Sequence, residues 1–292
     1  MVKHGRVVVL LHGLCGSSLD LRGFARRIRQ RGFHVVMPTL TGYGAPETEL
    51  SLGFARPDYH RWIAEVTAEI DDLAEMHTDV YLSGVGLGAT MALAVAAERP
   101  TKLEALALIS TILIVDGWNV SRWRWLLPLA YYTPLGHFYR IRATAPFGIK
   151  NPRMRAWIAA MVERGTPASG EAVSIPTAYL LQADRLIRHA IDSLGRVRTP
   201  TLMIHAREDD VASIANVHFV RRQIGTDQFR EVIVENSYSM ITLDNDCDYA
   251  ASRTVGFFNA IAKRNNESLG VNAQLGAQLG FSLLNAAGGQ AL

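Results

Sequence analysis

Residues 80–89 read VYLSGVGLGA, and this stretch decides the fold. A short run of strand-forming residues leads into three glycines at alternate positions, and an alanine-rich segment of helical character follows. Glycine adopts positive φ angles without penalty, so it suits a sharp turn that joins a strand directly to a helix. We therefore predict a strand at Val80–Leu82 and a helix at Leu87–Arg99.

The same alternation of strand and helix continues on both sides of this stretch. The other predicted strands are Arg6–Leu11, His34–Met37, Ala105–Ile109, Thr201–Ile204 and Glu231–Val234. The other predicted helices are Leu19–Arg31, Tyr59–His77, Ile214–Ile224 and Tyr249–Lys263. Strands that alternate with helices are typical of an α/β fold, in which a mostly parallel, doubly wound sheet has helices on both faces.

The composition excludes several other classes of protein. The 292 residues are 49% hydrophobic and 20% charged, which is ordinary for a globular domain and excludes a wholly disordered chain. A net charge of +3 is too small to favour nucleic acid as a partner. The longest apolar stretch, Leu103–Val115, is shorter than the roughly 18 residues of a membrane span, and no secretory signal precedes the first strand. Two cysteines cannot form a disulfide framework, so we expect a cytoplasmic protein.

Two segments depart from the alternation. We expect the core domain to comprise residues 1–111 and 196–263, with a helical cap at 112–195 that contains no strand. The cap has more basic than acidic residues, which fits either a solvated helical face or a lid that attracts anions. Its aromatic residues are Trp118, Trp123, Trp125, Tyr131, Tyr132, Phe138 and Tyr139. The tail at 264–292 is rich in Asn, Gln, Gly, Ala and Leu, and we expect it to be flexible or to form a homo-oligomer by docking on a neighbouring chain.

Two turns carry motifs of a catalytic site. After the first predicted strand comes His12-Gly13-Leu14, where the backbone amide of Leu14 would point into a site as an oxyanion donor. Residues 84–88 have the frame of the nucleophile elbow, Gly-x-Ser-x-Gly, but Gly86 stands where the motif has serine.

These turns occur with three further motifs, Gly42-Tyr43-Gly44, the segment 206–209 (ARED) and the segment 236–244 (NSYSMITLD). Over residues 6–111 and 196–262 the chain therefore resembles the carboxylesterase and monoacylglycerol-lipase branch of the α/β-hydrolase superfamily. The resemblance implies that Asp209 is the catalytic acid, that Gly86 occupies the nucleophile position and that Ser239 occupies the position of the catalytic histidine. It also implies an oxyanion or ligand-binding site at Leu14 and Leu87, with Cys15 and Tyr238 beside it.

A hydrolase that lacks both nucleophile and base is not expected to hydrolyse esters at an ordinary rate. Losing either group costs about 10⁶-fold in turnover, and an oxyanion hole alone retains roughly 10³ to 10⁴ over water. We expect Ser83, His12 and His205 to be structural and Cys15 to be a small buried side chain rather than a new nucleophile. Asp209 should take a hydrogen bond from Ser239 or from water. The histidines lack metal-ligand spacing and no loop has a nucleotide-binding pattern, so no metal or cofactor is expected.

Three functions fit this sequence. The first is a pseudoenzyme that binds a small acyl or carbonyl compound without hydrolysing it, and the basic cap would suit an anionic or carrier-bound ligand. The second is a repurposed catalyst without a nucleophile, such as a cyclase, lyase or decarboxylase, that uses the oxyanion hole and Asp209. The third is a carboxylesterase, lipase or acyltransferase whose site carries engineered replacements.

Overall fold

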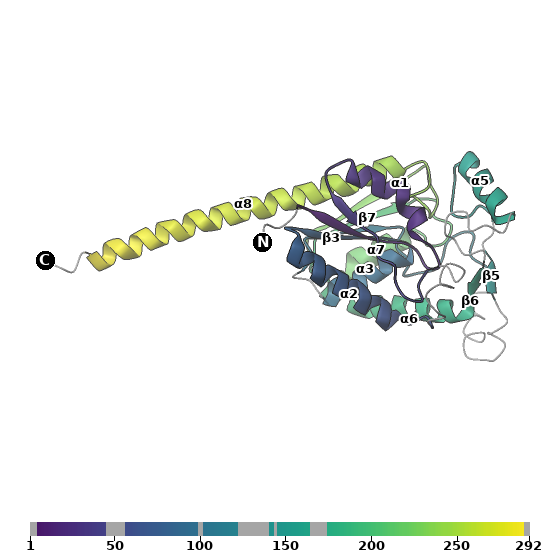
Figure 1. Ribbon diagram of the computed structural model, residues 1–292, viewed down its shortest axis with the longest axis horizontal. Coiled ribbons are helices and arrows are strands. Elements are labelled where there is room, and N and C mark those ends of the chain that lie inside the picture. Colours follow the sequence, from purple (N-terminus) through teal and green to yellow (C-terminus); the bar gives the residue numbers. More distant parts are fainter. Residues whose placement is uncertain are drawn as a thin grey trace.

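A single parallel sheet forms the centre of the molecule (Figure 1). The computed structural model describes residues 5–44, 56–98, 102–121, 140–142, 145–163 and 174–288. The sheet has six strands in the order β2-β1-β3-β4-β7-β8, and every neighbouring pair is parallel. In chain order these strands are β1 (Val7–Leu11), β2 (His34–Val36), β3 (Val80–Val85), β4 (Ala105–Ile109), β7 (Thr201–Ala206) and β8 (Phe229–Val234). The predicted α/β fold is confirmed.

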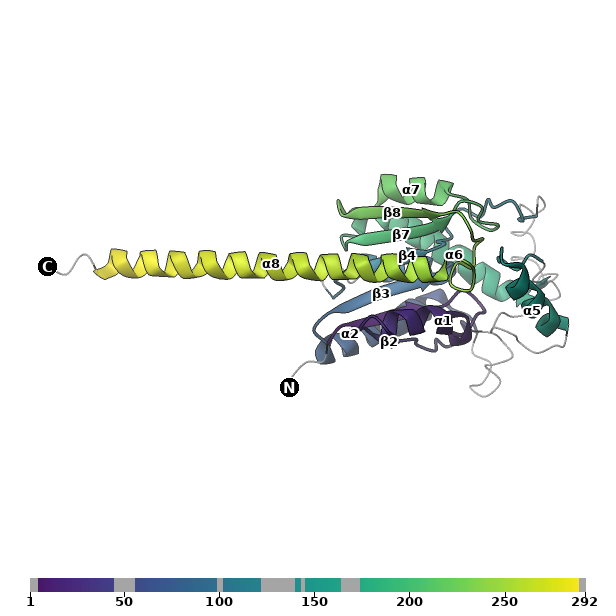
Figure 2. The same ribbon diagram turned by 90° about the horizontal axis from the view of Figure 1, so that it is seen from above.

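Helices cover both faces of the sheet, as Figures 1 and 2 show. One face packs against α1 (Ser18–Arg29) and the first turns of α8 (Cys247–Gly288). The other face packs against α2 (Tyr59–Met76), α3 (Leu87–Glu98), α6 (Thr177–Ser193) and α7 (Ala215–Gln223). Strand β1 serves both cores because successive side chains alternate between faces: Leu10 lies in the α1 and α8 core, and Leu11 lies in the opposite one.

The segment predicted as a strand-free cap contains two short strands. Strands β5 (Arg140–Arg142) and β6 (Ser174–Pro176) form an antiparallel pair, and helix α5 (Pro152–Glu163) lies between them in the chain. Helix α6, which was expected in the cap, packs into the main core, and a short 3-10 turn at Leu194–Arg196 follows it. The predicted absence of strands from 112–195 is therefore wrong. Six of the aromatic residues noted above lie outside the described residues: Trp123, Trp125, Tyr131, Tyr132, Phe138 and Tyr139.

Helix α8 is longer than predicted, because it continues without a break from the core into the tail. Its first turns are held by buried Ala250, Phe258 and Ile261, whereas its distal half projects away from the sheet (Figures 1 and 2). Among the helices that the structure describes, none has the length and apolarity needed to cross a membrane.

The parallel register places the carboxyl ends of all six strands at one edge of the sheet. Ligands of open α/β sheets bind outside this edge. The turns after β1 and β3 and the loops after β4, β7 and β8 meet there, and they contain every candidate site residue predicted from the sequence.

Candidate functional site

The turn between β3 and α3 has the geometry of a nucleophile elbow. Gly86 has a φ of +58°, its amide donates to the Ile109 carbonyl (2.9 Å), and α3 begins at the next residue. A Cβ atom added to Gly84 or Gly88 would lie 2.3 or 2.4 Å from a backbone oxygen, so both flanking positions require glycine. At Gly86 an added Cβ would meet only Ile112 Cδ1 at 3.6 Å, which is ordinary contact. The frame of the motif is thus retained, and a serine would fit at its centre.

The turn after β1 presents the second predicted oxyanion donor. The Cys15 amide donates to the Tyr43 carbonyl (3.0 Å), and the Tyr43 hydroxyl donates to the His12 carbonyl (2.9 Å), so the turn is fixed from behind. In the part of the chain that the structure describes, the amides of Leu14 and Leu87 donate to no protein acceptor. Backbone amides with this freedom can bind a carbonyl or carboxylate oxygen.

A largely apolar cavity of about 440 Å³ lies above these two turns. Its lining includes Gly86 and Cys15 and a set of apolar side chains from the core and the cap, among them Leu14, Leu87, Ile112, Phe147, Leu180 and Met240. Tyr238, which the resemblance placed beside the oxyanion site, is not among the described lining residues. Its ring instead packs against Trp118 with centroids 5.3 Å apart, and the Lys150 ammonium lies 5.7 Å from it.

Ser239, at the predicted base position, is bonded to an unexpected partner. Its hydroxyl donates to Asp210 Oδ1 (2.6 Å), and its amide donates to the same oxygen (3.2 Å). Of the two donors expected for Asp209, Ser239 is therefore wrong, and a hydrogen bond from water stays a prediction. The reason is local, because Asp209 turns its carboxylate into its own loop and the next residue, Asp210, faces the cavity instead.

Asp209 is a buried carboxyl group with one oxygen satisfied. Its Oδ1 accepts from the amides of Val211 (2.9 Å) and Ala212 (2.8 Å), and the Ser110 hydroxyl faces the carboxyl group without a hydrogen bond of ordinary geometry to Oδ2. The nearest base is His205, whose Nε2 lies 3.6 Å from Oδ2. That nitrogen donates to the Ala212 carbonyl (2.6 Å), and burial lowers the pKa of His205, so the ring is neutral. Burial raises the pKa of Asp209 to about 7.

The other predicted structural residues have local partners. Ser83 is buried and donates to the Ala107 carbonyl (2.9 Å), away from the elbow. His12 is also buried, and its Nδ1 lies 2.8 Å from the Gly13 carbonyl, so this nitrogen carries the proton. Both side chains therefore have local backbone partners. Within the described residues no cluster of His, Cys, Asp and Glu could hold a metal ion.

A turn of the cap lies directly over Ser239. Gly148 has a φ of +69°, and a Cβ atom added there would lie 2.5 Å from Ser239 Oγ. The Met240 amide donates to the Gly148 carbonyl (2.9 Å) and ties the turn to the loop after β8. The cap backbone therefore packs tightly against the position where the catalytic histidine is expected.

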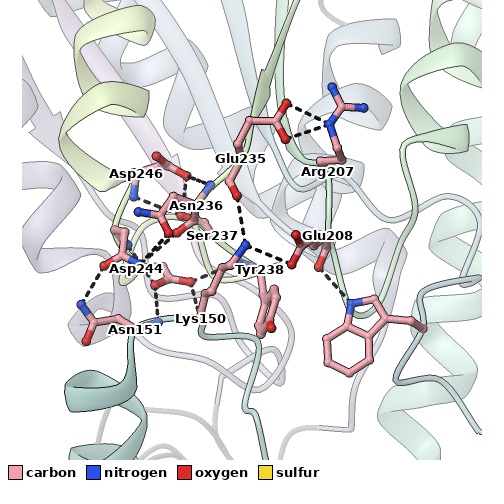
Figure 3. A network of polar contacts seen from close by, with 12 residues as sticks. Lys150, Asn151, Arg207, Glu208, Glu235, Asn236, Ser237, Tyr238, Asp244 and Asp246 are labelled. Carbon is pink, nitrogen blue, oxygen red and sulfur yellow. Dashed lines mark hydrogen bonds and ion pairs between the residues drawn. The ribbon is translucent and has the colours of Figure 1, made fainter.

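Polar contacts around Lys150 hold this turn in place (Figure 3). The Lys150 ammonium donates to Glu208 Oε2 (3.0 Å) and to the Glu235 carbonyl (3.1 Å), and the Glu208 contact raises the pKa of Lys150. The Asp244 carboxylate accepts from the amides of Lys150 (2.6 Å), Asn151 (2.9 Å) and Tyr238 (3.1 Å). We call Lys150, Asn151, Glu208 and Asp244 the cap clasp. It connects the cap to the loops after both β7 and β8.

Comparisons with known proteins agree with this geometry. The family model described as serine aminopeptidase, S33, matches residues 3–246. This chain belongs to the serine aminopeptidase S33 family. The thermostable monoacylglycerol lipase of Bacillus sp. (strain H-257) is 25% identical over 251 residues, which span 86% of this chain and 89% of that protein. The carboxylesterase of Bacillus subtilis (strain 168) is 22% identical over 244 residues, spanning 83% and 88%.

Solved structures show the same fold. A chain from the work on LipS and LipT, two metagenome-derived lipolytic enzymes, has a TM-score of 0.71 at 22% identity, covering 87% of this chain and 94% of that chain. The monoacylglycerol lipase of Paleococcus ferrophilus has a TM-score of 0.68 at 16% identity, with the same two coverages. The predicted resemblance is confirmed. This member of the S33 family is an α/β-hydrolase of the lipase and esterase type.

Sequence reasoning missed Asp210, Gly148 and the cap clasp. Asp210 is adjacent to Asp209 in the sequence, so the consecutive acids were a visible signal, but the orientation of each depends on the turn between them. Gly148 and Ser239 are far apart in the chain, so no local sequence pattern predicts their contact.

Proposed function

We propose that this protein binds a small acyl or carbonyl compound in the cavity and does not hydrolyse esters at an ordinary rate. The observation that carries the proposal is the Ser239 hydroxyl donating to Asp210 at 2.6 Å, in a site whose elbow holds Gly86. A serine hydroxyl near neutral pH is too weak a base to activate a nucleophile, and glycine supplies none. The binding elements remain, because the amides of Leu14 and Leu87 belong to the backbone.

The cavity supports binding of a small ligand. Its volume of about 440 Å³ lies in the usual range for small-molecule sites, and its lining is mostly apolar with a few polar groups. The carbonyl oxygen would accept from Leu14 and Leu87, and the hydrocarbon part would contact Ile112, Phe147 and Met240. Such a ligand would lie between the elbow and the cap turn.

A binding experiment tests this placement. Hexanamide, which cannot be hydrolysed readily, would be titrated calorimetrically into the parent protein and into the variants Gly86→Phe and Gly86→Ala. Both variants carry a side chain at positive φ, but only phenylalanine extends beyond Cβ into the cavity. We expect Gly86→Phe to weaken binding at least about tenfold relative to Gly86→Ala. Equal affinities of the two variants would contradict the proposed site.

A second candidate is favoured by the acidic residues of the site. Asp210 lines the cavity, where its carboxyl group could exchange a proton with a ligand. Asp209, whose pKa burial raises to about 7, lies next to it in the chain but is turned into its own loop. This arrangement would suit a catalyst that moves a proton without a nucleophile. Recovering a bound ligand after prolonged incubation discriminates the two candidates: unchanged mass and structure support binding alone, and conversion that Asp210→Asn abolishes supports catalysis.

A further inference from the structure

Asp210 is a buried carboxylate that faces the cavity with one oxygen uncommitted. Its exposed fraction is 3%. Oδ1 takes both hydrogen bonds from Ser239, and within the described residues Oδ2 accepts none. Because Asp210 lines the cavity, Oδ2 is the oxygen that a ligand can reach. A buried carboxylate without a full set of donors costs free energy, and a donor from a ligand would recover it.

The charge of the lining selects the kind of group that can meet Asp210. No lysine, arginine or histidine is among the described residues that line the cavity, whereas Asp20 and Asp210 both are. Two of the described basic residues of the cap form ion pairs, Lys150 with Glu208 and Arg188 with Asp184. An anionic group would therefore be repelled beside Asp210, and a hydroxyl or an ammonium group would be attracted.

Two hydroxyl groups line the cavity on the same side as Asp210. The hydroxyls of Ser110 and Thr242 are buried and line the cavity. The Thr242 hydroxyl has no hydrogen-bond partner among the described residues, and the Ser110 hydroxyl faces the Asp209 carboxyl group. Ser110 has a φ of +48° at the end of β4, a conformation that non-glycine residues adopt rarely. Ser110 and Thr242 thus add two sites for hydrogen bonds near Asp210.

The sheet order separates the polar groups into two sets. The amide donors of Leu14 and Leu87 follow β1 and β3, whereas Ser110, Asp210 and Thr242 follow β4, β7 and β8. Strand β7 lies two positions from β3, which corresponds to roughly 10 Å between their backbones. Side chains shorten that gap, so one small molecule of several bonds can reach both sets.

From this arrangement we infer that the ligand is an acyl compound that carries a hydrogen-bond donor, a hydroxyl or an ammonium group, several bonds from its carbonyl, and that Asp210 selects it. The inference rests on the proposed function, since it places the carbonyl on the Leu14 and Leu87 amides. Asp210 is a specificity-determining residue in this account. Ser239 orients its carboxylate by holding Oδ1.

The test compares three amides of equal chain length: hexanamide, 6-hydroxyhexanamide and 6-aminohexanamide. Each would be titrated calorimetrically into the parent, into Asp210→Asn and into Asp248→Asn, with thermal unfolding to verify that each variant is folded. Asp248→Asn is the matched control, because it removes the same charge from an exposed residue paired with Arg27. We expect the parent to prefer at least one donor-bearing amide about tenfold or more over hexanamide, and only Asp210→Asn to lose that preference.

The outcomes separate the inference from the proposed function. If hexanamide binds and neither donor improves its affinity, or if Asp210→Asn keeps the preference, the inference fails and the proposed function stands. If none of the three amides binds the parent, both fail. The two donor arms identify the source of the hydrogen bond: a preference for the amine that weakens with added salt assigns an ammonium group, and a salt-independent preference for the alcohol assigns a hydroxyl.

Discussion

The two sides of the site use different chemical groups, backbone amides on one side and side chains on the other. At the ends of β1 and β3, the donors are backbone amides, and the turn retains the glycines and the positive φ of a nucleophile elbow. At the ends of β7 and β8, the function depends on side chains, and Ser239 bonds to Asp210 beneath a cap turn. Substitutions remove side chains easily and backbone amides hardly at all. Under the proposed function, this α/β-hydrolase binds through backbone amides and has no catalytic side chain at residues 86 and 239.

The largest loss of stability is expected from a substitution in the glycine turn between β3 and α3. Gly88→Ala would place a Cβ atom 2.4 Å from the His12 carbonyl oxygen and 2.7 Å from the Leu11 oxygen, and the backbone would have to move. We expect a loss of about 3 kcal/mol or more in the free energy of unfolding, or no folded protein.

Gly256→Ala is the control for that substitution, because Gly256 lies within α8 with no atom near an added Cβ. It should stabilise the protein by about 0.5 to 1 kcal/mol. Urea denaturation measures both variants. A Gly88→Ala protein as stable as the parent would show that the elbow does not need its glycine frame.

The next largest effect is the pH dependence of stability caused by Asp209, after β7. The folded-state pKa of Asp209 is raised to about 7, above its ordinary value of 3.8, so the folded protein binds the proton more tightly than the unfolded chain does. Asp209 therefore lowers the stability progressively as the pH rises from about 4 to 7. Asp209→Asn removes this term.

We expect the stability of Asp209→Asn relative to the parent to increase by about 2 to 3 kcal/mol between pH 5 and pH 8. Denaturation at both pH values measures this difference between the two proteins. A difference that stays constant with pH would mean that Asp209 is ionised throughout, with a donor for Oδ2.

A smaller effect is expected from the cap clasp. Asp244→Asn replaces a buried acceptor of four backbone amides with a group that can accept at only one end. We expect the free energy of unfolding to fall by about 2 kcal/mol. Asp248→Asn, at an exposed ion pair, should change it by less than about 0.5 kcal/mol. Equal effects of the two substitutions would show that the clasp does not stabilise the cap turn.

The central sheet could be predicted from the sequence because its signals are local. Strand β4 is a continuous apolar run, and the glycines of residues 84–88 mark the turn where a strand meets a helix. The assignment of Gly86 and Ser239 to one site came from the resemblance to the α/β-hydrolase branch, and the parallel sheet places both at one edge. Such signals need no knowledge of distant contacts.

The features that could not be predicted from the sequence depend on contacts between segments far apart in the chain. The short strands β5 and β6 are joined by pairing across more than thirty residues, and neither has a strong pattern of its own. Helix α6 is amphipathic in the manner of a cap helix, and its place in the core is decided by packing against α3. The bond of Ser239 to Asp210 rather than Asp209 depends on the turn that Asp209 itself caps.

The central claim is that this protein does not hydrolyse esters at an ordinary rate. The most direct test measures hydrolysis of p-nitrophenyl butyrate by three proteins: the parent, the double variant Gly86→Ser with Ser239→His, and a control with Gly86→Ala and Ser239→His. The control shares the histidine and the strained backbone at residue 86 but has no hydroxyl. The account predicts that the parent and the control hydrolyse the ester no faster than about 10³ to 10⁴ over water. Any gain should appear only in the variant with serine. Turnover by the parent at the rate of an ordinary serine esterase would contradict the account.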